Sequence, residues 1–218
     1  GFDCGIAFDG DADRCLAVDE NGEIIDGDMM MAILAKRFME EGRLYKNILI
    51  PTIMSNMGLF KFAEENGISC YPTKVGDRYV LESMLETGCV IGGEQSGHII
   101  LKKYATTGDG LLTALMLAEE MRDKKSTLAQ LAEPVTLFPQ YLINLRVKDK
   151  NAVMEDQEVL AEVAKVEEII NGNGRVLLRQ SGTEPVIRVM VEAETDELCK
   201  AHAHRIYDFI KERGHAND

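Results

Sequence analysis

The sequence predicts an α/β domain with a mixed sheet, followed by a small α+β domain. Over residues 24–133, short apolar segments alternate with helical segments of roughly a dozen residues, the pattern of a parallel or mixed sheet covered by helices. Two of the five prolines then fall within 134–139, which predicts a linker. Beyond it, two neighbouring strand-like segments joined by a short loop lie between helical segments, which favours an antiparallel sheet.

The individual elements are predicted from apolar runs and from the residues that cap them. In the first part, strands are expected at 4–8, 15–18, 47–50, 68–71, 89–91 and 98–101, and helices at 28–41, 56–65, 77–86 and 109–122. Asp28 and Asp109 are placed to cap two of these helices, and Gly42 and Gly67 to end two. In the second part, strands are expected at 141–147, 174–179 and 186–193, and helices at 151–170 and 195–213.

The composition excludes several classes of protein. Of the 218 residues, 45% are apolar and 28% charged, which is typical of globular proteins, and no apolar run is long enough to cross a membrane. A net charge of −13 argues against a nucleic acid or an anionic membrane as partner. Five cysteines without a CxxC pair favour reduced thiols in a cytoplasmic protein over disulfides or a zinc site. The first residues carry no secretory signal. Because the sequence begins with Gly1 rather than Met and enters a strand-like segment almost at once, we expect a piece of a longer protein.

The first chemically informative loop is Asp9-Gly10-Asp11-Ala12-Asp13-Arg14, between two predicted strands. Its three carboxylates can converge on one hard cation if the loop curls, and Gly10 permits the curl. An EF-hand would place Glu20 at its twelfth position, but Arg14 stands where that loop requires glycine. A solvated acidic turn is the other alternative. The dense carboxylates favour Mg²⁺ bound together with a phosphate oxygen.

The second loop is Gly92-Gly93-Glu94-Gln95-Ser96-Gly97-His98, also between two predicted strands. Glu94 and Ser96 can bond sugar hydroxyls, and His98 can move a proton near neutral pH. A hairpin with a polar tip is the alternative. A weaker feature, Lys74-Val75-Gly76-Asp77-Arg78-Tyr79, stands at a strand-to-helix junction, where helix capping by Asp77 is an equally good explanation.

The third loop is Arg179-Gln180-Ser181-Gly182-Thr183-Glu184-Pro185, followed by Arg188. Backbone amides around Gly182, two hydroxyl groups and two arginines form the kind of nest that binds a tetrahedral dianion. An ordinary hairpin loop is the alternative.

Together the three loops resemble those of the α-D-phosphohexomutase superfamily, over essentially the whole chain. DGDADR resembles its metal loop, GEQSGH its sugar-binding loop, and RQSGTEP with the following IRVM its phosphate-binding loop, in the same order. GEQSGH with VGDRYV is most similar to the bacterial members that act on glucosamine phosphate. One departure is Gln180, where the family more often has proline.

The resemblance implies a domain organisation. Residues 1–23 correspond to the end of domain 2 with the metal loop, 24–133 to domain 3 with the sugar-binding loop, 134–139 to a linker, and 140–218 to domain 4, whose fold resembles the TATA-box-binding protein. The family's catalytic serine lies in a Thr-Ala-Ser-His-Asn type of loop, which this sequence does not contain. We therefore expect a C-terminal piece that is inactive alone.

The resemblance also implies a reaction and its residues. Glucosamine 6-phosphate and glucosamine 1-phosphate would interconvert through a phosphoserine and a 1,6-bisphosphate, in the supply of UDP-N-acetylglucosamine for cell-wall synthesis. Asp9, Asp11 and Asp13 would hold Mg²⁺, the only expected cofactor, with Arg14 and His98 as catalytic residues. The expected substrate ligands are Glu94, Ser96, Arg179, Ser181, Gly182, Thr183 and Arg188.

Other functions remain open at this stage. A phosphomannomutase or phosphoglucomutase would use the same loops on another hexose phosphate. A DxD-dependent glycosyltransferase would use paired aspartates but needs a nucleotide-binding fold, and a non-catalytic phosphosugar-binding module would need only the binding loops. In each mutase alternative the partner is a small phosphosugar. The oligomeric state is left open, with a homodimer of the full-length form among the alternatives.

Overall fold

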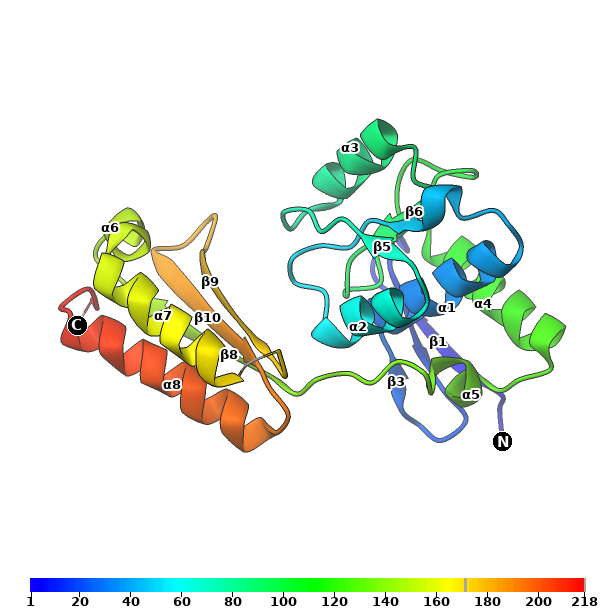
Figure 1. Ribbon diagram of the computed structural model, residues 1–218. Helices are drawn as coiled ribbons and strands as arrows, with labels where there is room; N and C mark the ends of the chain where they lie inside the picture. Colours follow the sequence, from blue (N-terminus) through cyan, green and yellow to red (C-terminus); the bar gives the residue numbers. More distant parts are fainter. Residues whose placement is uncertain (171, 218) are drawn as a thin grey trace. The chain divides into compact units, whose positions relative to one another are not determined.

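The computed structural model describes residues 1–170 and 172–217 and divides the chain into two compact units, Gly1–Leu137 and Phe138–Asp218 (Figure 1). Each unit has a hydrophobic core of its own. The boundary between the units falls inside the predicted linker 134–139. Val135 of that segment is only 4% exposed and packs in the first core, so the first half of the segment is not a free connection.

The first unit opens with a small antiparallel sheet in the order β1-β2-β3, made of Gly5–Phe8, Cys15–Val18 and Ile24–Ile25. Its Cys15, Ala17 and Ile25 side chains are buried in the core, and helix α4 (Gly110–Lys124) packs against β2. The strand β3 was not predicted, because two residues carry no readable alternation. This sheet places the Asp9–Asp13 loop at the turn between β1 and β2.

The α/β part of the first unit contains the mixed strand pairing that the sequence predicts. Strands β4 (Ile48–Leu49) and β5 (Ser69–Cys70) are parallel, whereas β6 (Ile91–Gly93) and β7 (Ile99–Leu101) are antiparallel. A parallel bridge between Ile50 and Gly92 connects the two pairs. Strands β4, β5 and β7 are shorter than predicted, and β6 has the predicted length but begins two residues later. Buried residues such as Ile50 and Ile68 extend the apolar runs beyond the regular ladders.

Helices cover these strands and differ in detail from the predicted ones. They are α1 (Gly27–Glu40), α2 (Met57–Glu65), α3 (Asp77–Thr87), α4 (Gly110–Lys124) and the unpredicted α5 (Leu128–Ala132), with a 3₁₀ turn at Tyr45–Asn47. Asp109 caps α4 as predicted. The prediction for α1 was wrong: Asp26 is its cap, and Asp28 is buried in the first turn, where its Oδ2 accepts the Asn56 N–H at 2.6 Å.

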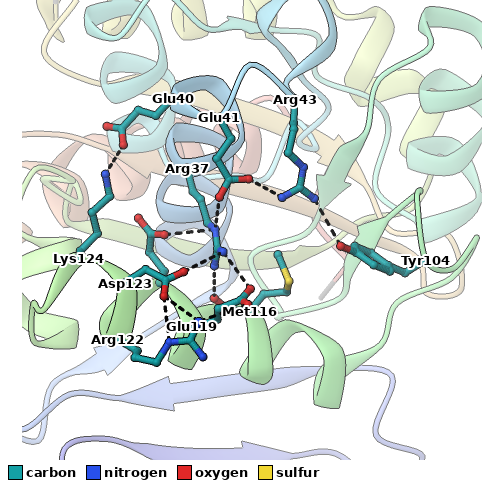
Figure 2. A network of polar contacts seen from close by, with 11 residues as sticks. Arg37, Glu40, Glu41, Arg43, Tyr104, Met116, Glu119, Arg122, Asp123 and Lys124 are labelled. Carbon is teal, nitrogen blue, oxygen red and sulfur yellow. Dashed lines mark hydrogen bonds and ion pairs between the residues drawn. The ribbon is translucent and has the colours of Figure 1, made fainter.

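An ion-pair network centred on Arg37 connects α1 to α4 (Figure 2). The Arg37 side chain is 7% exposed and donates to Glu41, the residue that caps the C-terminus of α1, at 2.8 Å. Across the helix interface it donates to Glu119 at 2.9 Å and to the Met116 carbonyl at 3.2 Å. Glu120, also buried, lies 3.3 Å from the Arg37 Nε. One buried cation is thus shared among several carboxylates, which fixes the register of the two helices.

The second unit is the predicted α+β domain with an antiparallel sheet. Strands β8 (Gln140–Arg146), β10 (Val186–Glu192) and β9 (Arg175–Gln180) lie in the order β8-β10-β9. Helices α7 (Gln157–Ile170) and α8 (Asp196–Glu212) lie side by side on one face of this sheet, and the short α6 (Lys150–Glu155) precedes them (Figure 1).

The prediction of a single helix at 151–170 is wrong, because the helix is interrupted at Asp156. This residue has extended backbone angles and its carboxylate accepts the Glu158 N–H at 2.9 Å, so it starts a new helix rather than continuing the old one. Asp156 also accepts hydrogen bonds from Arg213 and His215 near the end of the chain. These long-range contacts are invisible to helical periodicity, which is why the break was not predicted.

Among residues 1–170 and 172–217, no helix combines the length and the apolar character that crossing a bilayer requires.

Cys15 and Cys70 are expected to react slowly with thiol reagents, because only the thiolate is nucleophilic. Burial, with a smaller contribution from nearby charges, raises the pKa of Cys70 to about 12 and that of Cys15 to about 11. Iodoacetamide at pH 8, followed by peptide mass spectrometry, should therefore label the partly buried Cys4 before Cys15 and Cys70. In urea all five cysteines should label alike. Rapid labelling of Cys70 in the native protein would contradict the described packing.

Candidate functional site

The carboxylates of Asp9, Asp11 and Asp13 converge at the β1–β2 turn. One oxygen from each lies within 4.8 Å of the others. The curl that brings them together is made by Ala12, whose φ is +58°, and not by Gly10 as the sequence suggested. Asp13 Oδ1 is buried and accepts no hydrogen bond from the described residues. A buried carboxylate oxygen that receives no hydrogen bond, beside two more carboxylates, offers the oxygen ligands that a hard divalent cation prefers.

Arg14 follows this triad and balances part of its charge. The Arg14 Nε lies 3.8 Å from an oxygen of Asp9 and 3.8 Å from Asp13 Oδ1. The Arg14 backbone N–H donates to Asp9 at 3.3 Å. About half of the Arg14 side chain remains exposed, at 49%. Its guanidinium is therefore held beside the triad while keeping donors free for an anionic ligand.

His98 lies behind the triad and holds Asp13 in place. Its Nδ1 is 2.9 Å from Asp13 Oδ2, and its Nε2 accepts the Gly108 N–H at 3.0 Å. Because Nε2 is an acceptor, Nδ1 carries the proton and donates it to the carboxylate. The ring is buried with both nitrogens engaged. This geometry fits a residue that orients Asp13, and it does not fit the predicted proton shuttle.

The sugar-binding loop predicted at 92–98 forms the turn between β6 and β7. Its Glu94 Oε1 accepts the Gly76 N–H at 3.0 Å, which brings the Lys74–Tyr79 segment beside it. Asp77 does not cap α3 through its side chain, because Gly76 occupies the cap position. The Gln95 amide donates to Asp26, the cap of α1, at 3.2 Å. The loop is therefore fixed from two sides by residues far away in the sequence.

The metal loop and the sugar-binding loop are bonded directly to each other. The Cys15 N–H donates to the Gly97 carbonyl at 3.3 Å, in addition to the His98–Asp13 contact. A cavity of about 260 Å³ is lined by residues of both loops. Another cavity of this unit, of about 270 Å³, is lined by none of the predicted site residues. The residues around the first of these cavities are Ala7, Phe8, Asp9, Arg14, Cys15, Leu16 and Ser96. The structure thus brings together the predicted Asp9, Arg14 and Ser96.

Residues 106–110 also support the metal loop and His98, a role that was not predicted from the sequence. Gly108 donates to His98, and the Gly110 N–H donates to the Ala12 carbonyl at 2.9 Å. The sequence was interpreted there only as a helix start. The Thr-Thr-Gly-Asp-Gly run was the available signal, because closely spaced glycines permit close approach of two backbones.

The predicted phosphate-binding loop lies in the second unit, between β9 and β10. Arg179 and Arg188 are directly opposite each other in the β9–β10 ladder, so their side chains share one face of the sheet. That face is opposite to the one on which Ile187 and Val189 pack in the core with the helices. Ser181 is buried, whereas Gly182 and Thr183 are exposed. All five predicted ligands are therefore within one strand–loop–strand unit.

The two arginines have the electrostatics of an anion site. Within residues 1–170 and 172–217, the buried Nε atoms of Arg179 and Arg188 have no hydrogen-bond partner. Burial, and to a smaller degree the neighbouring Arg188 charge, lowers the pKa of Arg179. Among the described residues no carboxylate pairs with either guanidinium group, so the two positive charges repel each other. A dianion bound between them would offset this repulsion and supply the hydrogen-bond acceptors that the two Nε atoms lack.

Comparison with known proteins decides the family. The profile described as phosphoglucomutase/phosphomannomutase, alpha/beta/alpha domain III, matches residues 26–138, and that of the C-terminal domain matches residues 142–209. The chain belongs to the phosphoglucomutase/phosphomannomutase family. The family that the sequence resembles is thereby confirmed.

The curated relatives of this mutase-family chain are close in sequence. It is 53% identical to the phosphoglucosamine mutase of Bacillus cereus (strain AH187) over 211 residues, which are 97% of this chain and 47% of the relative. The phosphoglucosamine mutase of Bacillus anthracis (strain CDC 684 / NRRL 3495) matches with the same figures. The chain therefore spans about half the length of the curated relatives it matches.

Solved structures confirm the fold. An Aspergillus fumigatus N-acetylphosphoglucosamine mutase superimposes with a TM-score of 0.82 at 19% identity, covering 96% of this chain and 48% of the other. A structure of the same enzyme in complex with GlcNAc-6P and magnesium gives a TM-score of 0.78 at 20% identity, covering 94% of this chain and 51% of that one. At this identity the likeness establishes the fold alone.

Proposed function

We propose that residues 1–218 form the metal-binding, sugar-binding and phosphate-binding part of a phosphoglucosamine mutase. The observation that carries this proposal is the cavity where Asp9 and Arg14 of the metal loop meet Ser96 of the sugar-binding loop. The identity to curated phosphoglucosamine mutases favours glucosamine phosphate over mannose or glucose phosphate as substrate. The proposed reaction interconverts glucosamine 6-phosphate and glucosamine 1-phosphate.

The Asp9, Asp11 and Asp13 carboxylates fit Mg²⁺. Their oxygens lie within 4.8 Å of one another, and the buried Asp13 Oδ1 lacks a hydrogen-bond donor among the described residues. Oxygen ligands of this kind suit a hard cation that also binds phosphate. When bound, Mg²⁺ would neutralise charge on the phosphoryl group and orient it. His98 would hold Asp13 in its ligating orientation through the Nδ1–H contact of 2.9 Å.

The proposed transfer proceeds in two balanced steps. In the first step the phosphoryl group of a phosphoserine moves to O1 of glucosamine 6-phosphate: the P–Oγ bond breaks, a P–O1 bond forms, O1 loses its proton and the serine oxygen gains one. In the second step the 1,6-bisphosphate has turned round: its P–O6 bond breaks, a P–Oγ bond forms, the serine hydroxyl loses its proton and O6 gains one, which leaves glucosamine 1-phosphate and the phosphoserine. The phosphoserine is not among residues 1–218, where no Thr-Ala-Ser-His-Asn type of segment occurs.

The residues of this chain would act by positioning and by charge neutralisation, which dominate phosphoryl transfer. The half-exposed Arg14 guanidinium would stabilise charge on the transferred group. Glu94 and Ser96 would orient the sugar hydroxyls, Glu94 with the oxygen that Gly76 does not occupy. Arg179 and Arg188 would hold the phosphate that does not react.

Titration of the chain with glucosamine 6-phosphate tests the proposal. Following backbone amides by NMR, we expect Gly182 and Thr183 to shift with millimolar affinity, about −4 kcal/mol, whereas unphosphorylated glucosamine should leave them unchanged. Arg179→Lys keeps the charge but loses the guanidinium fork, so it should weaken binding. The matched control is Arg205→Lys on α8, where the guanidinium pairs with Glu162 at 2.6 Å. Unshifted Gly182 and Thr183 amides, or an Arg179→Lys variant that binds like the parent, would show that this loop is wrongly assigned.

Binding of Mg²⁺ by the metal loop is expected to be weaker than micromolar, because three carboxylates repel one another unless a further anionic ligand shares the cation. Asp11→Asn should weaken binding further, by roughly tenfold, because affinity follows the number of charged ligands. Asp3→Asn removes the same charge from an exposed residue outside the triad and should have little effect. Calorimetry with Mg²⁺ would measure both, and equal losses in the two variants would argue against the triad as the site.

A further inference from the structure

Helix α6 is bonded to the phosphate-binding loop through its first two residues. The Lys150 Nζ donates to the Ser181 carbonyl at 2.7 Å. The Gln180 side-chain amide donates to Asn151 Oδ1 at 2.9 Å. Two adjacent residues of the helix thus hold two adjacent residues of the loop. The start of α6 is itself anchored, because Asp149 accepts the Asn151 N–H at 2.8 Å.

The Lys150 contact determines the direction of the Gly182 N–H, which is a proposed hydrogen-bond donor to the phosphate. The Ser181 carbonyl and the Gly182 N–H belong to one planar peptide group and point in opposite directions across it. Holding the carbonyl toward Lys150 therefore turns the Gly182 N–H away from α6. A Cβ added at Gly182 would have nothing within 4 Å, so packing does not constrain the Gly182 side of this peptide, although Ser181 itself is buried. The orientation of this peptide depends on hydrogen bonds.

We propose that Lys150 is a positioning residue of the phosphate-binding loop, which presents the Gly182 N–H to the anion by fixing the Ser181–Gly182 peptide plane. The hydrogen bond between Gln180 and Asn151 is a second, uncharged connection between the loop and α6. It gives a structural use to Gln180, the position where this sequence departs from the proline of related loops, because proline has no side-chain donor. This inference rests on the proposed function, since it assumes that the loop binds phosphate.

The test uses the whole chain, inorganic phosphate as the probe, and amide NMR as the readout. Lys150→Met should weaken phosphate binding by about fivefold or more, since it removes a charged hydrogen-bond donor from the loop. The matched control is Lys148→Met, which removes the same charge two residues away, from an exposed lysine that donates to the Gly214 carbonyl at 3.1 Å. Binding to that control should stay within about twofold of the parent, because exposed charges are screened. Lys150→Arg should recover most of the affinity.

Two further measurements separate positioning from charge and from stability. Asn151→Ala removes the second connection without a charge change and should weaken binding by about twofold to threefold. Without phosphate, the Gly182 amide resonance should move in Lys150→Met and not in Lys148→Met. Equal affinities and equal Gly182 positions in the two lysine variants would overturn the inference while leaving the proposed function intact. A parent chain that does not bind phosphate would overturn both.

Discussion

Arg37→Met is expected to destabilise the first unit by about 3–5 kcal/mol, the usual cost of removing one partner from a buried ion pair. The substitution leaves Glu120, whose side chain is 6% exposed, without the cation 3.3 Å away. It also removes the bonds by which Arg37 joins α1 to α4 (Figure 2). Amide hydrogen exchange of α1 and α4 measures this loss directly, with peptides from α7 and α8 as an internal reference.

The matched control is Arg122→Met on α4. Arg122 pairs with two carboxylates that also pair with Arg37, Glu119 at 3.5 Å and Asp123 at 2.7 Å, but its side chain is 70% exposed. Since exposed ion pairs contribute little, we expect a change of at most about 0.5 kcal/mol. Equal protection losses in the two variants would mean that burial of Arg37 does not have the role assigned to it.

The Arg37 contribution should also depend on pH. The hydrogen bond from Arg37 holds the pKa of Glu41 below its usual value. A group whose pKa is lowered by folding contributes stability above its unfolded pKa, about 4.3 for glutamate, and loses it as the pH falls. The difference between the parent and Arg37→Met should therefore shrink below that pH, because Glu41 becomes protonated in both.

Gly97→Ala is expected to cost about 3 kcal/mol or more and to separate the metal loop from the sugar-binding loop. Gly97 has a φ of +89°, which L-residues adopt at a cost of roughly 1–2 kcal/mol. A Cβ there would lie 1.9 Å from the Cys15 carbonyl oxygen, a backbone atom that cannot move without displacing β2. Overpacking of this kind adds roughly 1–3 kcal/mol. Thermal unfolding followed by circular dichroism would report the loss, and Mg²⁺ titration would report the damage to the site.

Gly10→Ala is the control for this substitution. Gly10 lies in the metal loop, has no positive φ, and would place its Cβ in open space. The free energy of unfolding of Gly10→Ala should therefore lie within about 0.5 kcal/mol of that of the parent, as is usual for surface substitutions. If Gly97→Ala is as stable as Gly10→Ala, the close approach of Gly97 to β2 is not present in solution.

Local signals in the sequence were sufficient for most elements and for all three loops. Asp109 was predicted as the cap of α4, and the alternating strands 141–147 and 186–193 were predicted to within a residue or so. A cap or an alternating strand depends on residues within one or two turns, so its pattern can be read directly. The Asp-x-Asp-x-Asp spacing indicated converging carboxylates for the same reason.

The sequence by itself therefore determined the family, the order of the loops and the residue types that could bind a metal, a sugar and a phosphate. Only the tertiary structure decided that Asp26 and not Asp28 caps α1, that Asp156 divides the predicted helix, and that His98 supports Asp13. It also decided that Lys150 holds Ser181. Each of these outcomes depends on a hydrogen bond or a packing contact with a residue distant in the chain. Such contacts form only when the core brings the segments together, and no local periodicity encodes them.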